Sequence, residues 1–268
     1  MVANQDGVWS DSMPDAYERN LSIPVFQPFA IDLARRVAER RPARVLELAA
    51  GTGVLTRELL AFLPGVELVA TDLNDAMVDV GRRLAPVADW GQADAVMLPF
   101  RDAGFDAVVC QFGVMFFSDR TRAFAEVRRV LIPGGAFAGN VWGPIEDHDY
   151  QAAVLDGLAQ AFPDDPPRFL ASVPHADADP GRLLADLRAG GFADVQVETV
   201  TLETTAPSAR DLAVGYCAGT PVRAEIDQRG GGLAPAVDAV VTAIEDRLGL
   251  NGGPGTGRMA AHFFVAVG

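Results

Sequence analysis

The residues best suited to chemistry lie in a turn of small residues, 49–53, and at an aspartate further along the chain. Gly51 and Gly53 let the backbone approach a ligand closely and adopt a positive φ where that is needed. Asp72 lies near the usual offset of about 20 residues from such a turn, where a carboxylate accepts the ribose hydroxyls of a nucleotide. The turn and the carboxylate together predict a nucleotide-like ligand.

A strand and a helix must position this turn. Residues 45–48 form a short apolar run that is typical of a buried parallel strand. Residues 54–62 carry apolar positions at helical spacing. A strand, a tight turn and a helix form the front half of a nucleotide-binding βαβ unit. The start of the helix offers unpaired N–H groups and a partial positive charge to a ligand.

The alternation of strands and helices continues to residue 142, which predicts an open parallel sheet with helices on both faces. Asn74 is a predicted helix N-cap, and Ser118 or Asp119 is predicted to cap the helix that ends near residue 131. The further predicted strands are 66–70, 87–92, 105–112 and 136–142, and the further predicted helices are 29–40, 74–84 and 119–131.

The pattern changes after Gly143, where helical and loop segments dominate and only two more strands are predicted. Helices are expected at 150–162 and 180–189 and through most of 207–249. Gly-Thr-Pro at 219–221 and three glycines at 230–232 are expected to break the last of these segments. Strands are expected at 195–202 and 262–267. We expect one domain with a Rossmann-like, doubly wound and mostly parallel seven-stranded sheet and helical cap insertions over its carboxyl edge. Its expected parts are an N-terminal helical lid (1–42), the cofactor-binding core (43–143), cap segments (144–180 and 205–257) and the last strands (192–204 and 258–268).

Composition excludes several classes of protein. A formal net charge of −14 argues against binding to nucleic acid or to an anionic membrane surface. All 22 basic residues counted as Lys and Arg are arginines, so Schiff-base chemistry and a Walker-type P-loop are excluded. The three histidines show no metal-ligand spacing, and the two cysteines are expected to be reduced thiols. Residues 1–7 lack the features of a signal peptide, and no apolar run could span a membrane, so a cytoplasmic protein is expected.

From residue 43 to residue 142 the chain resembles the class I S-adenosylmethionine-dependent methyltransferases, of the UbiE-like small-molecule type. The segment Val-Leu-Glu-Leu-Ala-Ala-Gly-Thr-Gly at 45–53 matches the first motif of that family, which usually has glycine where Ala49 stands. The resemblance implies that the backbone of this turn contacts the aminocarboxypropyl part of the cofactor. It also implies that Glu47 helps to hold the amino group of the cofactor.

Three further segments carry the resemblance. Asp72 would accept the ribose hydroxyls, and the segment 93–95 would place a carboxylate at the adenine amino group. The end of the strand 105–112 would lie beside the sulfonium centre, at the carboxyl edge where open α/β sheets bind ligands. The expected cofactor-binding residues are Tyr17, Glu47, Ala49, Gly51, Thr52, Gly53, Asp72, Leu73, Met77, Ala93, Asp94, Ala95, Gln111 and Phe112.

Two other enzyme classes fit the sequence less well. A nicotinamide-dependent oxidoreductase would have a third glycine three residues after Gly53, where this chain has Thr56. The segment Asp-Pro-Pro-Arg at 165–168 is similar to a motif of amino-methylating nucleic-acid enzymes, but it follows the fifth strand and not the fourth.

Methyl transfer from a sulfonium is an in-line displacement, so the protein mainly holds the reactants in place and excludes water. Tyr17 is similar to an N-terminal tyrosine that closes over the cofactor in related enzymes, and packing of the first helix is the alternative role. His148 is the candidate general base, with neighbouring carboxylates that would raise its pKa, and a solvated loop histidine is the alternative.

A small, neutral or partly aromatic acceptor is expected, with oxygen mildly preferred over carbon and nitrogen as the acceptor atom. A homodimer is compatible with the sequence. A protein that binds the cofactor without catalysis, as a regulatory or assembly subunit, is the other class left open.

Overall fold

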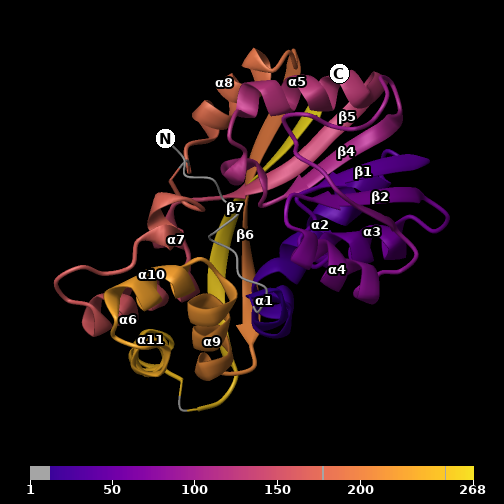
Figure 1. The fold of residues 1–268 in the computed structure, drawn as a ribbon. Helices are drawn as coiled ribbons and strands as arrows, with labels where there is room; N and C mark the ends of the chain where they lie inside the picture. Colours follow the sequence, from indigo (N-terminus) through magenta and orange to yellow (C-terminus); the bar gives the residue numbers. More distant parts are fainter. Residues whose placement is uncertain (1–12, 177, 251) are drawn as a thin grey trace. The chain divides into compact units, whose positions relative to one another are not determined.

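The computed structural model describes residues 13–176, 178–250 and 252–268, and these contain a seven-stranded sheet in the order β3-β2-β1-β4-β5-β7-β6 (Figure 1). Neighbouring strands from β3 to β5 are parallel, whereas β7 runs antiparallel to β5. The strands are β1 (Arg44–Leu48), β2 (Glu67–Asp72), β3 (Asp89–Gln92), β4 (Phe105–Gln111), β5 (Leu131–Trp142), β6 (Asp194–Ala206) and β7 (Gly255–Val267). The predicted Rossmann-like, mostly parallel sheet is confirmed.

The chain divides into two compact units. The core unit comprises 29–142, 177–200 and 261–268, and the helical unit comprises 1–28, 143–176 and 201–260. Strands β6 and β7 contribute residues to both units. The helical unit contains most of the segments expected to form the lid and the caps, and their action as caps stays a prediction.

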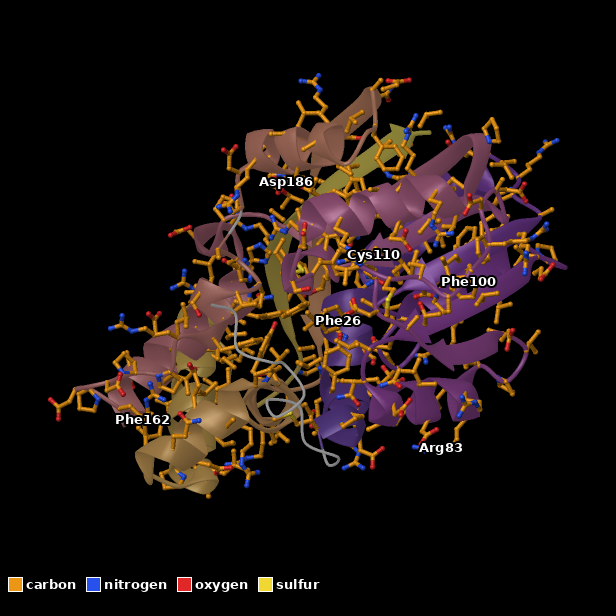
Figure 2. All side chains as sticks on the ribbon, turned by 45° about the horizontal axis from the view of Figure 1, so that its top comes forward. Phe26, Arg83, Phe100, Cys110, Phe162 and Asp186 are labelled. Carbon is orange, nitrogen blue, oxygen red and sulfur yellow. The ribbon has the colours of Figure 1, made fainter. Side chains whose placement is uncertain are left out.

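In the core unit, helices cover the sheet on both faces. Figure 1 shows α5 (Arg120–Val130) and α8 (Pro180–Ala189) on one face, with α2 (Gln27–Ala38), α3 (Val54–Phe62) and α4 (Asp75–Leu84) on the other. Because both faces are covered, the central strands are apolar along their length: four of the five residues of β1 are buried, including one carboxylic acid. Figure 2 shows Cys110 within the body of this unit, and both cysteines are free and buried, as predicted.

Local signals place the helix starts of the core unit. The Asn74 side chain accepts a hydrogen bond from the backbone N–H of Ala76, and the Asp119 side chain accepts one from the backbone N–H of Arg122. Both predicted N-caps are therefore confirmed. Asp179 caps α8 in the same way, with Pro180 in its first turn, and an ion pair of 3.3 Å joins Asp186 to Arg120 of α5.

The helical unit contains most of the remaining helices, and glycines permit their close packing. A Cβ on Gly215 of α9 would lie 2.6 Å from Leu21 of α1, and a Cβ on Gly157 of α6 would lie 2.5 Å from Val240 of α11. The predicted breaks at 219–221 and 230–232 separate α9, α10 and α11. The helices are α1 (Met13–Leu21), the π-helical η2 (Ser22–Phe26), the 3-10 turn η4 (Ile145–Asp147), α6 (Asp149–Ala161), α7 (Phe169–Ser172), α9 (Ala209–Gly219), α10 (Val222–Arg229) and α11 (Leu233–Leu248).

The structure corrects several predicted bounds. The first described helix begins at Met13, well before the helix predicted at 29–40. Residues 1–12, on which the expectation about a signal peptide depends, lie outside the described residues. Strand β6 extends to Ala206 and β7 begins at Gly255, so both strands are longer than the predicted 195–202 and 262–267 and enter the expected cap segment 205–257. His262 therefore lies within β7; its ring nitrogens lie 2.8 Å from Thr199 and from the carbonyl of Ala178, as expected of a structural histidine.

Among the residues that the structure describes, no helix has both the length and the apolar character needed to cross a membrane.

Candidate cofactor-binding site

The turn after β1 has a backbone that favours glycine at three positions. Gly51 and Gly53 have φ values of 56° and 86°, and Ala49 has a φ of 51°, which is unusual for a residue with a side chain. A Cβ on Gly51 would meet no atom within 4 Å, so the space beside its backbone is open. Gly53 is the N-cap of α3 and provides no side-chain cap, which leaves the first N–H groups of the helix available to a ligand.

Asp72, at the end of β2, links this turn to the sheet by a hydrogen bond. Its Oδ2 accepts a hydrogen bond of 2.8 Å from the N–H of Gly51, and its Oδ1 accepts one of 2.9 Å from the N–H of Asn74. Loss of water around the carboxyl raises the pKa of Asp72, although these N–H groups act in the opposite direction. The N–H of Leu73 also donates to this carboxylate, which has about four acceptor positions, so it can still accept a hydrogen bond from a ligand hydroxyl.

Glu47 lies beneath the same turn, with only 1% of its surface exposed. Its Oε2 accepts a hydrogen bond of 2.6 Å from the Thr56 hydroxyl. Burial raises the pKa of Glu47 to about 8, with Thr56 and Arg57 lowering it in part. The carboxyl is therefore mainly protonated at neutral pH, and a cationic group bound beside it would favour its ionisation.

The turn after β4 packs directly against the turn after β1. A Cβ on Gly113 would lie 2.5 Å from the Cβ of Ala49 and 2.6 Å from the Sγ of Cys110, so only glycine fits there without displacement. Phe112 has a φ of 49°, and its N–H donates to both the backbone oxygen and the side-chain oxygen of Asn140. This packing sets the turn that follows Gln111 and Phe112 against the first turn, and the place of these two residues beside the sulfonium stays a prediction.

The remaining predicted residues follow β2 and β3. Leu73 is 43% exposed beside Asp72, which is unusual for a leucine, whereas Met77 is buried. The N–H of Ala93 donates to the backbone oxygen of Asp72, and the Asp94 carboxylate accepts the N–H of Val96. The chain thus places an apolar side chain and two carboxylates along the ends of neighbouring strands β2 and β3.

Sequence reasoning did not identify Trp90 as part of this region. Its ring lies 3.0 Å from the position of a Cβ on Gly53 and 2.2 Å from that of a Cβ on Gly81. Its Nε1 donates to the backbone oxygen of Ala85. A large residue in the short strand β3 was the available signal, and its packing explains why Gly53 has no side chain.

Comparison with known proteins agrees with this geometry. A family model described as a methyltransferase domain matches residues 46–139. The demethylmenaquinone methyltransferase of Deinococcus radiodurans is 34% identical over 196 residues, 66% of this chain and 79% of that protein. The ubiquinone/menaquinone biosynthesis C-methyltransferase UbiE of Ralstonia pickettii is 32% identical over 216 residues, 75% of this chain and 84% of that protein.

Solved structures show the same fold. The YcgJ protein of Bacillus subtilis has a TM-score of 0.57 at 23% identity, covering 90% of this chain and 98% of that one. Phosphoethanolamine N-methyltransferase 2 of Haemonchus contortus, solved with S-adenosylhomocysteine, has a TM-score of 0.62 at 18% identity, covering 98% of this chain and 59% of that one.

The fold and these relatives define a class I methyltransferase that uses S-adenosylmethionine. The chain belongs to the UbiE-like methyltransferase family. The residues present fit the cofactor, since the open side of Gly51, the remaining acceptor capacity of Asp72 and the exposed Leu73 provide what a nucleoside needs.

Two predicted site residues, Tyr17 and His148, belong to the helical unit, and their roles toward cofactor and acceptor stay predictions. His148 is fully buried, so the alternative of a solvated loop histidine is wrong. Its ring lies edge to face against that of His175, with 4.6 Å between ring centroids. Within the described part of the chain, no three His, Cys, Asp or Glu side chains are grouped to hold a metal ion.

Proposed function

We propose that this methyltransferase transfers the methyl group to a ring carbon of a small quinol-type acceptor. The names of the relatives support a quinone-derived acceptor and, for UbiE, carbon as the acceptor atom. Carbon is therefore favoured over the oxygen that the sequence mildly preferred. The structural observation that supports the proposal is a cluster of buried aromatic rings at the ends of β4 and β5. Phe112 follows β4 and Trp142 ends β5, and Phe29 of α2 and Phe263 of β7 belong to the same aromatic cluster.

The aromatic cluster includes Phe112, one of the residues expected to flank the sulfonium. The Phe112 ring stacks on Trp142, with 3.4 Å between centroids and an interplanar angle of 10°. The edge of Phe29 contacts both rings, with centroid distances of 5.5 and 5.3 Å. An acceptor that reaches this end of the sheet would meet aromatic rings, which favour a flat, apolar molecule over a charged one.

The residues of the core unit would position the methyl donor as follows. Asp72 would accept the ribose hydroxyls, Leu73 would cover the adenine, and Asp94 would accept from the adenine amino group. Glu47, once ionised, would balance the ammonium of the methionine part. When bound, the cofactor supplies a methyl group on a positively charged sulfur, which makes that methyl electrophilic.

The atoms and electrons of the proposed methyl transfer balance without a metal or an oxidant. A bond forms between the acceptor carbon and the methyl group while the S–CH₃ bond breaks, and its electron pair stays on sulfur. The ring carbon then loses a proton to a base, for which His148 stays the candidate. The quinol hydroxyl groups promote the step because they donate electron density to the ring.

The test is methyl transfer by the purified protein from S-adenosylmethionine to 1,4-naphthalenediol under anaerobic, reducing conditions, with catechol as an oxygen acceptor in parallel. We expect a product 14 mass units heavier with its methyl on carbon. A methyl on catechol oxygen alone would overturn the proposed acceptor atom. Binding of S-adenosylhomocysteine with no product from a broad panel of acceptors would favour the non-catalytic role.

The homodimer and the cytoplasmic location stay predictions. Sedimentation equilibrium of the purified chain and fractionation of cells that express it are the direct measurements.

A further inference from the structure

A buried pair of side chains joins β1 to α3 beneath the glycine turn of the core unit. The Glu47 carboxyl and the Thr56 hydroxyl lie 2.6 Å apart, and the two residues are 1% and 0% exposed. A carboxylate removed from water is costly unless donors or a positive charge compensate for the lost hydration. The hydrogen bond from Thr56 compensates only in part, since burial still raises the pKa of Glu47 to about 8. A further positive charge beside this carboxyl would therefore be stabilised.

The Thr56 hydroxyl also lies close to the glycine turn. Its Oγ1 would be 3.3 Å from a Cβ on Gly53, the residue that precedes α3. Thr56 is the third residue of α3, so the partial positive charge of the helix start acts on the carboxyl that Thr56 contacts. The carboxyl is thus held next to the backbone that is expected to contact the methionine part of the cofactor.

The titratable groups that act on Glu47 come from α3, β2 and β4. Arg57 of α3 lowers the pKa of Glu47, and its guanidinium donates to the backbone oxygen of Thr52 at 3.0 Å. Asp72, at the end of β2, raises the pKa of Glu47. Cys110 of β4 stays neutral, because burial raises the pKa of its thiol far above the usual value. After burial, the hydrogen bond from Thr56 has the largest effect on Glu47, and it favours the charged form.

The hydroxyl of Thr56 is a well-placed donor. The β-branched side chain restricts its own χ1, so the hydroxyl has few orientations on the helix. A glutamate side chain is flexible, and a fixed donor on one oxygen sets the direction of the other. Glycine at position 56, as in the dinucleotide-binding fingerprint, would provide no such donor.

We propose that Thr56 is a positioning residue whose hydroxyl holds the Glu47 carboxylate toward the ammonium group of S-adenosylmethionine. This inference rests on the proposed function, in which Glu47 balances that ammonium. When the ammonium binds, the O–H bond of the Glu47 acid breaks, its electron pair stays on the carboxylate and the proton passes to solvent. The motif match at 45–53 ends before Thr56, so it assigns no role to this residue.

The test is calorimetric titration with three ligands that share the adenosine part. S-adenosylhomocysteine has the amine and the carboxyl group, decarboxylated S-adenosylmethionine has the amine alone, and 5′-methylthioadenosine has neither. Thr56→Val deletes the hydroxyl, and Thr56→Ser keeps it. Thr71→Val is the matched control, because Thr71 is also buried and its hydroxyl donates at 2.8 Å to the backbone oxygen of Glu47 and not to its carboxyl.

We expect Thr56→Val to bind both amine-bearing ligands about tenfold more weakly at pH 7, as the loss of a hydrogen bond to a charged group predicts. Its affinity for 5′-methylthioadenosine should be unchanged. Thr56→Ser should bind all three ligands like the wild-type protein. Thr71→Val should lower the thermal midpoint and leave the relative affinities for the three ligands unchanged.

Proton release gives a readout that a purely structural role would not change. Because the pKa of Glu47 is about 8, the wild-type protein should release about one proton per S-adenosylhomocysteine at pH 7, measured in buffers of different ionisation enthalpy. It should release none with 5′-methylthioadenosine. In Thr56→Val the affinity for S-adenosylhomocysteine should level off at a higher pH than in the wild-type protein, since the donor that lowers the pKa of Glu47 is lost.

Glu47→Gln distinguishes failure of this inference from failure of the role proposed for Glu47, and no acceptor is needed. If Glu47→Gln weakens binding of the amine-bearing ligands while Thr56→Val weakens all three ligands equally or none, the inference is overturned and the role of Glu47 stands. If Glu47→Gln binds S-adenosylhomocysteine like the wild-type protein, both are overturned. Thr56→Ala deletes the same hydroxyl with a smaller side chain and is measured in parallel, so the result does not depend on whether Thr56→Val folds.

Discussion

At the scale of single residues, Ala49 occupies a backbone position suited to glycine. Its φ of 51° is left-handed, which costs about 1–2 kcal/mol for a residue with a Cβ. Substituting glycine removes this strain, although glycine also loses more entropy on folding. We therefore expect Ala49→Gly to raise the free energy of unfolding by up to about 1 kcal/mol, measured by urea denaturation.

Ala50→Gly is the matched control, because Ala50 has no positive φ. This substitution should lower stability by roughly 0.5–1 kcal/mol. Equal effects of the two substitutions would contradict the role of strain at Ala49.

Glu47 gives the protein without ligand a predictable pH dependence. Its pKa is about 8 in the folded protein and 4.5 in its usual range, so the folded state binds more protons between these values. Stability from this carboxyl is complete below about pH 4.5 and is lost as pH rises through about 8. Urea denaturation from pH 5 to pH 9 should therefore show a smaller decline in Glu47→Gln than in the wild-type protein.

Glu67→Gln, at the exposed start of β2, is the control for this pH series and should keep the wild-type decline. Identical curves for the wild-type protein and Glu47→Gln would show that the buried carboxyl does not titrate in this range.

At the scale of elements, the close contact between the turns after β1 and β4 gives the sharpest prediction. Gly113→Ala would place a Cβ 2.5 Å from that of Ala49, and one turn would have to move. We expect a lower thermal midpoint and, since the moved turn belongs to the candidate cofactor site, at least about tenfold weaker binding of S-adenosylhomocysteine. Gly253→Ala controls for loss of a glycine, because Gly253 has no positive φ and its Cβ would meet no atom within 4 Å. Wild-type affinity in Gly113→Ala would refute the coupling of the two turns.

Local signals in the sequence were sufficient for most of the core unit. Helix α3 has the predicted bounds, and Asn74 and Asp119 cap their helices as expected, because these side chains act on neighbouring backbone groups. The carboxyl ends of parallel strands meet at one edge of a sheet, so the order of the motifs also predicted which residues come together.

Features that depend on contacts distant in sequence were not predicted. Gly257 is part of β7, well before the strand predicted from residue 262, and the Tyr150 ring lies 2.6 Å from where its Cβ would be, so a glycine fits this position of the strand. The burial of His148 against His175 could not be inferred from a segment rich in aspartate.

At the scale of the whole molecule, the predicted site residues are divided between the two compact units. The core unit contains the glycine turn, Asp72 and Asp94, and the helical unit contains Tyr17 and His148, whose roles stay predictions. A net charge of −14 agrees with the predicted neutral acceptor, because an acidic protein repels an acidic substrate.

The central claim is that the glycine turn and Asp72 bind the nucleoside of S-adenosylmethionine, and calorimetric titration with S-adenosylhomocysteine tests it most directly. The wild-type protein should bind one molecule per chain. Asp72→Asn should bind at least about tenfold more weakly, because hydrogen bonds to a charged group contribute about 1.5–3 kcal/mol. Asp75→Asn, three residues further along and exposed, should bind like the wild-type protein. Equal affinity of Asp72→Asn and the wild-type protein, or no binding to either, would contradict the account.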